Sequence, residues 1–180
     1  MSTTLITRSW LAFAAVGAGI IHLALVFSSP LVIGAPLLLL GLAEIAWAVV
    51  ILVRDRMIVP RLAQAGTIAP LMLWALLVVT ATLLGAPAVA SSLRFLPMAI
   101  AAVFEILIAA VLSVRFRRLA DEDRPPVAEK PAGAVRYLSA VLAAGILVGA
   151  LTTPALAATQ AGTVALEHGG MMGMPGMSHH

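Results

Sequence analysis

Long apolar segments alternate with short polar breaks along most of this 180-residue chain. A helix needs about 20 mostly apolar residues to cross the hydrocarbon core of a bilayer. Five segments meet this requirement, and they cover residues 9–27, 31–53, 67–85, 93–114 and 135–153. The breaks between them carry turn residues, as in Ser28-Ser29-Pro30. The pattern therefore predicts an all-α membrane protein with five transmembrane helices.

The composition excludes the common soluble classes of protein. Apolar residues make up 62% of the chain and charged residues only 11%, whereas soluble domains carry about 25% charged residues. These values rule out a soluble globular enzyme and a disordered chain. Cysteine is absent, which excludes a disulfide framework and a thiolate metal site. The sequence shows no nucleophile paired with a base and no phosphate-binding glycine loop, so we expect no enzymatic activity.

The basic residues indicate how the helices are oriented. If the N-terminus is cytoplasmic, ten of the eleven Lys and Arg residues fall on the cytoplasmic side and only Arg94 falls outside. Cytoplasmic loops of membrane proteins are enriched in Lys and Arg. This bias predicts a cytoplasmic N-terminus and an extracytoplasmic C-terminus. The net charge of +3 follows from the same bias, and we expect no nucleic-acid partner.

A polar, proline-containing run over residues 121–131 is the main linker of the chain. It separates four predicted spans from a fifth. The predicted organisation is a four-helix transmembrane unit over 1–118, a cytoplasmic linker over 119–134, a fifth transmembrane helix over 135–157, and an extracytoplasmic, flexible tail rich in Met and His over 158–180.

The second and fourth spans share the pattern P-x7-E-x9-R-x-R at an offset of 61 residues, starting at Pro36 and at Pro97. This pattern predicts a bundle of two repeated hairpins, about 9–57 and 67–118. The two hairpins would be related by a pseudo-twofold axis along the membrane normal. The alternative is coincidence, because basic residues are expected at the inner ends of helices in any case.

Four residues within the spans are candidates for ion chemistry. Glu44 and Glu105 lie near the middle of their spans, where an ionised carboxylate must be paired or must face a polar interior. The repeat would bring the two carboxyl groups together. His22 and Met98 lie in the outer halves of their spans, and Met98 shares a helix face with Glu105. The four residues predict a route for a proton or a metal ion; the alternative is that they are hydrogen-bonded packing residues.

The fifth span carries two further motifs. Gly145 and Gly149 form a G-x-x-x-G spacing, which allows close packing on another helix, a partner subunit or a second copy of the chain. Ala155 and Ala157 form an A-x-A sequence of the kind that signal peptidase cleaves. The sequence leaves open whether the tail is released after Ala157 or whether the helix simply ends in an Ala-rich stretch.

The tail holds four of the eight Met and three of the four His residues of the chain. Thioethers are soft, neutral ligands that favour Cu(I), and imidazoles can complete such a site. We therefore expect copper as a cofactor or cargo, bound by residues that lie close together in sequence: His168, Met171, Met172, Met174, Met177, His179 and His180.

Two resemblances accompany these patterns. The tail resembles the Met/His-rich segments of extracytoplasmic copper-handling proteins, and this resemblance implies metal binding. The features Gly19-x-x-His22, Trp47 between two alanines, and Glu105 resemble those of small uncharacterised multispanning membrane proteins of high-GC, actinobacterial-type bacteria. That second resemblance implies the membrane architecture only. We expect the protein to lie in the bacterial plasma membrane.

Three functions are compatible with the sequence. In the first, the protein binds copper on the outer side through its tail and buffers it or delivers it to a membrane partner. In the second, it is an accessory, non-catalytic subunit of a larger membrane complex, such as an oxidase or monooxygenase. In the third, it is a small proton- or cation-coupled transporter that uses Glu44 and Glu105. Its expected partners are the lipid bilayer and either a partner subunit or a second copy.

Overall fold

A computed structural model of the protein describes residues 5–54, 60–85, 94–120 and 133–171. Most of these residues lie in helices, and no strand occurs among them. The helices, in chain order, are α1 (Leu5–Val26), α2 (Leu31–Val53), α3 (Pro60–Leu83), α5 (Phe95–Ala120), α6 (Ala134–Ala157) and α7 (Gln160–Met171).

Five of these helices, all except α7, are long and apolar enough to cross a membrane. The predicted spans are therefore confirmed, but several helices extend beyond them. For example, α3 begins at Pro60 and not at residue 67, and α5 continues to Ala120 and not to residue 114. The added turns contain Arg, a good helix former that hydropathy alone does not assign to a span. Proline at the first position of α3 is also favourable, because that residue has no helical hydrogen bond to donate.

The first two helices are joined by the turn that the sequence predicted. The hydroxyl groups of Ser28 and Ser29 donate to the carbonyl oxygen of Leu25, at 3.1 and 2.8 Å. They thereby satisfy one of the carbonyl groups that the end of a helix leaves without a partner. Pro30 then precedes the first residue of α2.

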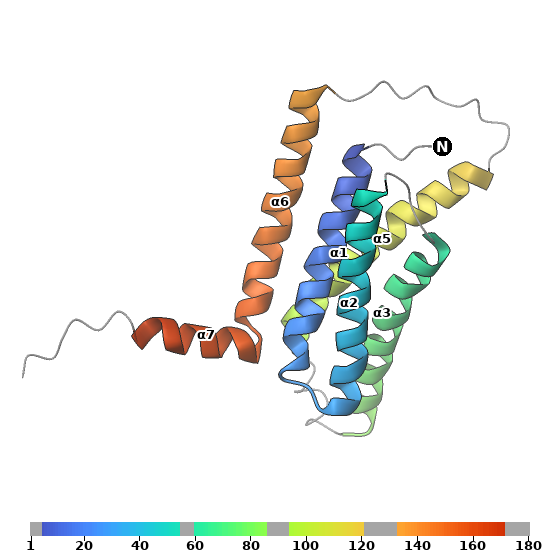
Figure 1. Ribbon diagram of the computed structural model, residues 1–180. Coiled ribbons are helices and arrows are strands. Elements are labelled where there is room, and N and C mark those ends of the chain that lie inside the picture. The colour runs from blue at the N-terminus through green and yellow to red at the C-terminus, as the bar shows by residue number, and fades with distance from the viewer. Residues whose placement is uncertain (1–4, 55–59, 86–93, 121–132, 172–180) are drawn as a thin grey trace, which may run out of the picture.

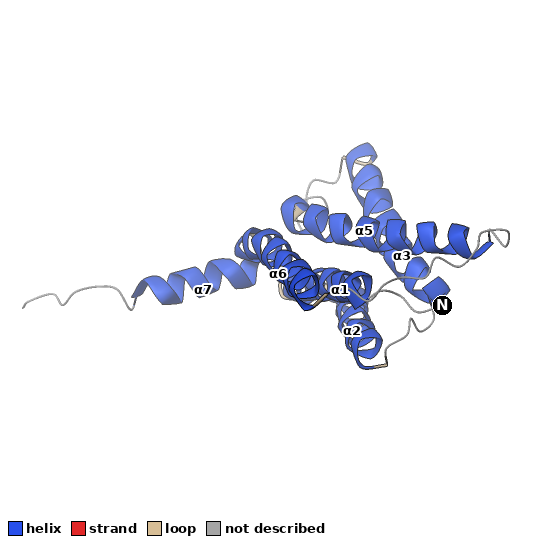
Figure 2. Cartoon of the chain, turned by 90° about the horizontal axis from the view of Figure 1, so that it is seen from above, coloured by secondary structure: helices blue, strands red, loops and turns tan. Residues whose placement is uncertain are grey.

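The first helix lies at the centre of the bundle. It packs against α2, α5 and α6, whereas α3 packs against α5 on the outside, as the two views in Figures 1 and 2 show. Of the apolar stretch of α1, 67% is buried inside the protein, against 6% of that of α3. α1 is therefore the helix whose side chains can reach several neighbours at once.

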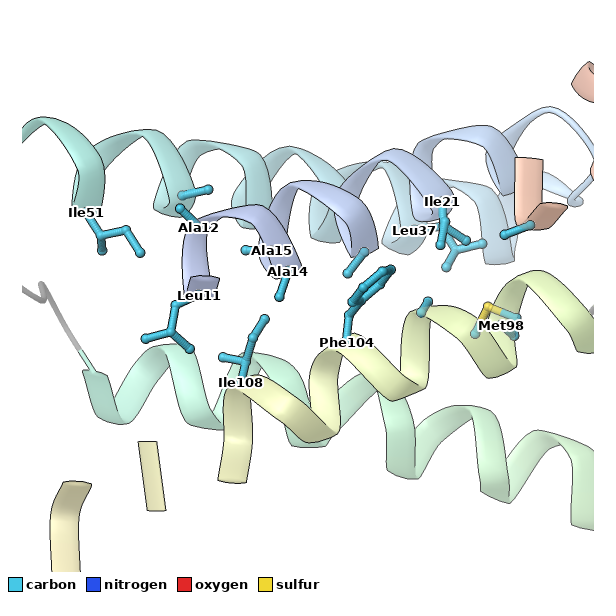
Figure 3. Packing of buried hydrophobic residues seen from close by; sticks show 14 of the residues in the cluster. Leu11, Ala12, Ala14, Ala15, Ile21, Leu37, Ile51, Met98, Phe104 and Ile108 are labelled. Atoms are coloured by element: carbon cyan, nitrogen blue, oxygen red, sulfur yellow. The ribbon is translucent and has the colours of Figure 1, made fainter. Parts of the chain in front are cut away.

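Small residues on α1 make this central position sterically feasible. Ala12, Ala14 and Ala15 are buried along it; Ala12 lies on the side of α2, and the larger side chains of Phe104 and Ile108 on α5 lie on the side of Ala14 (Figure 3). Without a hydrophobic effect between helices in lipid, such close van der Waals packing is the main force that holds a bundle together.

The C-terminal part of the chain turns sharply after α6, and α7 runs crosswise to it (Figure 1). The tail was predicted to be flexible from residue 158; in the structure its first part, Gln160–Met171, forms α7. The hydroxyl of Thr159 accepts a hydrogen bond from the backbone N–H of Gly162 at 3.2 Å and caps the new helix. The guanidinium group of Arg94, which precedes α5, donates to the carbonyl oxygen of Ala158 and ties this corner to the bundle.

The directions and contacts of the helices can be compared with the predicted topology. The starts of α1, α3 and α6 and the ends of α2 and α5 lie toward one end of the bundle (Figure 1), as alternating spans require. The helices of the two predicted hairpins are in contact, α1 with α2 and α3 with α5. The repeat, its axis and the assignment of this end to the cytoplasm stay predictions.

Candidate cation site

The site lies next to a close approach of the backbones of α1 and α2 at two glycines. A Cβ atom added to Gly19 would lie 2.8 Å from the carbonyl oxygen of Gly41, and one added to Gly41 would lie 2.7 Å from that of Gly19. Any side chain at either position would collide with the backbone of the facing helix. The two backbones therefore touch at this level of the bundle.

Each of these glycines is followed three residues later by an ionisable residue on the same face of its helix. His22 follows Gly19 on α1, and Glu44 follows Gly41 on α2. Because side chains lean toward the N-terminus of their own helix, both lean back toward the contact between the glycines. Glu44 lies close to this contact, since a Cβ atom added at Gly19 would lie 3.4 Å from the Cβ atom of Glu44.

The imidazole of His22 and the carboxylate of Glu44 meet at this contact. Nδ1 of His22 lies 2.8 Å from Oε2 of Glu44, which is a hydrogen bond of normal length. The two side chains are 1% and 9% exposed, respectively. The pair is thus enclosed by the protein and joins the two spans of the first predicted hairpin.

The third member of the cluster comes from α5. Oε1 of Glu105 lies 3.8 Å from Nε2 of His22, and the Glu105 side chain is 3% exposed. α5 can come this near because Gly17 faces it, and a Cβ atom at Gly17 would lie 3.0 Å from the ring of Phe104. One potential ligand atom from each of His22, Glu44 and Glu105 lies within 4.8 Å of the other two. We call these three residues the buried triad.

Two oxygen atoms of the triad have no hydrogen-bond partner among the described residues. They are Oε1 of Glu44 and Oε1 of Glu105, and both are buried. In each helix the next basic residue toward the C-terminus is ten positions further on, Arg54 and Arg115, which is about 15 Å along the axis. The triad therefore combines two carboxyl groups with a single imidazole and leaves oxygen atoms available for a positively charged species.

All three members of the triad were candidates predicted from the sequence, and the structure brings them together. The two glutamates were expected to approach across a pseudo-twofold axis; in the structure His22 contacts Glu44 on one side and faces Glu105 on the other. Met98 is buried in the apolar cluster near Ile21 and Leu37 (Figure 3). A role for Met98 in an ion route stays a prediction.

The predicted copper ligands lie largely outside the described residues. Met172, Met174, Met177, His179 and His180 follow the last described residue, and the side chains of His168 and Met171 on α7 are likewise not described. Copper binding by the tail stays a prediction.

The predicted packing glycines of α6 face open space within the described part of the chain. A Cβ atom added at Gly145 or at Gly149 would meet no atom within 4 Å. Packing of this face on another helix stays a prediction. The glycines that the structure does use, Gly17, Gly19 and Gly41, were not predicted, although the Gly-x-x-His and Gly-x-x-Glu spacings were visible in the sequence.

Comparisons of this chain with protein-family models, with curated proteins and with solved structures give no match.

Proposed function

We propose that this protein is a small cation carrier of the membrane, in which the buried triad takes up and releases a cation. The observation that supports the proposal is the burial of two carboxyl groups beside a single imidazole in the triad. With both carboxyl groups ionised, the triad carries a net charge of −2 or −1, depending on whether the imidazole is protonated. Charges within a membrane protein are costly unless they are neutralised. The triad therefore requires at least one further positive charge, which is either a proton or a metal ion.

The alternative interpretation is a hydrogen-bonded packing cluster, and the triad is larger than that role needs. One His–Glu hydrogen bond suffices to join α1 and α2, and such bonds contribute only about 0.6 kcal/mol on average between membrane helices. Glu105 adds a second carboxyl group at 3.8 Å from the imidazole nitrogen, beyond hydrogen-bond distance. Oε1 of this carboxyl group is buried without a hydrogen-bond partner among the described residues. A buried oxygen atom without a partner costs stability, and this cost favours a functional role over a packing role.

The test is cation uptake by proteoliposomes that contain the purified full-length protein. An internal pH dye reports proton movement, and chelator dyes report metal-ion movement. Glu105→Gln removes the charge but keeps the shape of the side chain, and we expect it to abolish uptake. Ser113→Ala is the matched control, because Ser113 is also a polar residue of α5 but hydrogen-bonds to Gln64 on α3 at 2.8 Å. Equal uptake by wild type and Glu105→Gln would show that the carboxyl group is structural.

A second candidate function rests on the composition of the tail. Four Met and three His residues fall within residues 168–180, and thioether groups favour Cu(I). In this proposal the tail captures copper for buffering or for delivery to a membrane partner. Anaerobic Cu(I) loading tests it: replacing the four tail Met residues by Leu should remove bound copper and leave the fold intact. Absence of both copper binding and cation uptake would leave the role of an accessory subunit.

A further inference from the structure

The gap between His22 and Glu105 has the size that a metal ion requires. Nε2 of His22 and Oε1 of Glu105 are 3.8 Å apart, which is too far for a hydrogen bond. Zinc-type ions bind imidazole nitrogen and carboxylate oxygen at about 2.1 Å. Two such bonds at the tetrahedral angle of zinc sites, about 109°, place the two ligand atoms about 3.4 Å apart. The observed distance of 3.8 Å is therefore within about 0.4 Å of the spacing expected for two ligands of one ion.

The hydrogen bond to Glu44 leaves the correct nitrogen of His22 free for this ion. An ionised carboxylate can only accept a hydrogen bond, so at 2.8 Å the proton is on Nδ1 of the imidazole. In the neutral ring the lone pair is then on Nε2, the nitrogen that faces Glu105. A carboxylate that holds one nitrogen of a histidine while the other binds the metal is a common arrangement around metal ions in proteins.

The charge and the unpartnered oxygen atoms point to a divalent ion. One divalent ion, two carboxylates and a neutral imidazole have zero net charge together. If a proton on one carboxyl group replaces the metal ion, the net charge is zero only when the imidazole is protonated as well. Oε1 of Glu105 is buried without a hydrogen-bond partner among the described residues and lies toward the gap. A metal ion would give this oxygen a partner.

The donor atoms restrict the kind of ion. Mg²⁺ and Ca²⁺ prefer sites made of oxygen atoms alone, and Cu(I) prefers sulfur. A site with one imidazole and carboxylates suits the divalent first-row transition metals, among them Zn²⁺ and its spectroscopic substitute Co²⁺.

We propose that the cation of the buried triad is a divalent first-row transition-metal ion, bound by Nε2 of His22 and by the carboxylate of Glu105. Glu44 is a positioning residue that holds the imidazole. This inference rests on the proposed function, because it names the cation that the triad takes up.

The experiment measures Co²⁺ and Zn²⁺ binding to the full-length protein in detergent. The Met and His residues at positions 168–180 are replaced by Ser in all samples, so that the tail contributes no ligands. We expect one Co²⁺ per chain with visible d–d absorption bands, and displacement of Co²⁺ by Zn²⁺. His22→Gln and Glu105→Gln should each abolish the bands. Glu44→Gln, which can still accept the hydrogen bond from Nδ1, should weaken binding about 10- to 100-fold while the bands persist.

Two controls make the outcomes decisive. Ser113→Ala on the same helix should bind Co²⁺ like the parent protein, and the thermal unfolding of every variant shows that it is folded. Binding that survives both His22→Gln and Glu105→Gln would identify an adventitious ion and overturn the inference, as would the absence of binding to the parent protein.

A separate readout distinguishes this failure from failure of the proposed function. The infrared carboxyl band of Glu105, assigned with Glu105→Gln, reports whether this residue takes up a proton as the pH changes. Absence of metal binding together with a titrating band would overturn the metal inference and leave proton uptake by the triad. Absence of both would overturn the metal inference and the proposed function together.

Discussion

The close approach of α1 and α2 can be tested by adding one methyl group, in the variant Gly19→Ala. The new Cβ atom would lie 2.8 Å from the carbonyl oxygen of Gly41 and equally close to the side chain of Ile45, whereas ordinary contacts begin at 3.4 Å. The two backbones must therefore separate locally by roughly 0.6 Å to relieve this overlap. If the same displacement is transmitted to the next turn, the His22–Glu44 hydrogen bond lengthens from 2.8 Å to about 3.4 Å and is largely lost.

The cost of this substitution combines two opposing effects. Overpacking of a closely packed interface typically costs about 1–3 kcal/mol. Replacement of Gly by Ala inside a helix recovers about 0.5–1 kcal/mol, because alanine has less conformational freedom to lose. We therefore expect Gly19→Ala to lower the free energy of unfolding by about 1–2 kcal/mol. Unfolding by SDS in mixed micelles, followed by circular dichroism, measures this change.

The matched control is Gly145→Ala, also in the middle of a spanning helix. A Cβ atom at this position meets no atom within 4 Å, so only the favourable effect on the helix applies and the variant should be as stable as wild type or slightly more so. If Gly19→Ala and Gly145→Ala have the same stability, the two backbones do not touch at Gly19 and the proposed origin of the His22–Glu44 contact is wrong.

Three further outcomes follow from the contacts described above. Gly162→Ala places a Cβ atom against the carbonyl oxygen of Leu156, so the turn between α6 and α7 should open and become more sensitive to proteolysis in a time course against wild type. Ser113→Ala removes the hydrogen bond to Gln64, and unfolding in SDS should show a loss of about 0.6 kcal/mol, and at most about 1.7 kcal/mol. Cleavage after Ala157 requires local unfolding of the corner where α6 ends, so intact mass of the purified protein should show a retained tail; a fragment that ends at this residue would contradict this expectation.

The sequence predicted the spans better than their packing, and the reason is physical. Burial of the backbone in lipid demands long apolar helices, so hydropathy alone located five of them. Which face of each helix points inward is poorly marked in segments made of Ala, Leu and Val. The approach of Glu44 to Glu105 was nevertheless predicted, because it followed from the spacing of the repeat and not from a hydrophobic face.

Two features were beyond the reach of the sequence. A glycine within a helix shows that close packing is possible but does not name the partner, so the contact between Gly19 and Gly41 required coordinates. The short helix α7 was missed because the tail is rich in Gly, a poor helix former. Its start depends on Thr159, which caps the helix only because the preceding residues turn sharply.

The position of His22 on the central helix explains why one imidazole can serve two carboxyl groups. Gly17 and Gly19 differ by two residues, about 200° around the helix axis, so they open nearly opposite faces of α1, one toward Phe104 on α5 and the other toward Gly41 on α2. His22 lies one turn further along and has one ring nitrogen for each side. Glu44 is hydrogen-bonded to His22 at 2.8 Å, whereas Oε1 of Glu105 lies 3.8 Å from the imidazole, beyond hydrogen-bond distance. Binding and release of a cation would therefore change the contact between α1 and α5 more than that between α1 and α2, and α5 is the helix whose position we expect to depend on the occupancy of the triad.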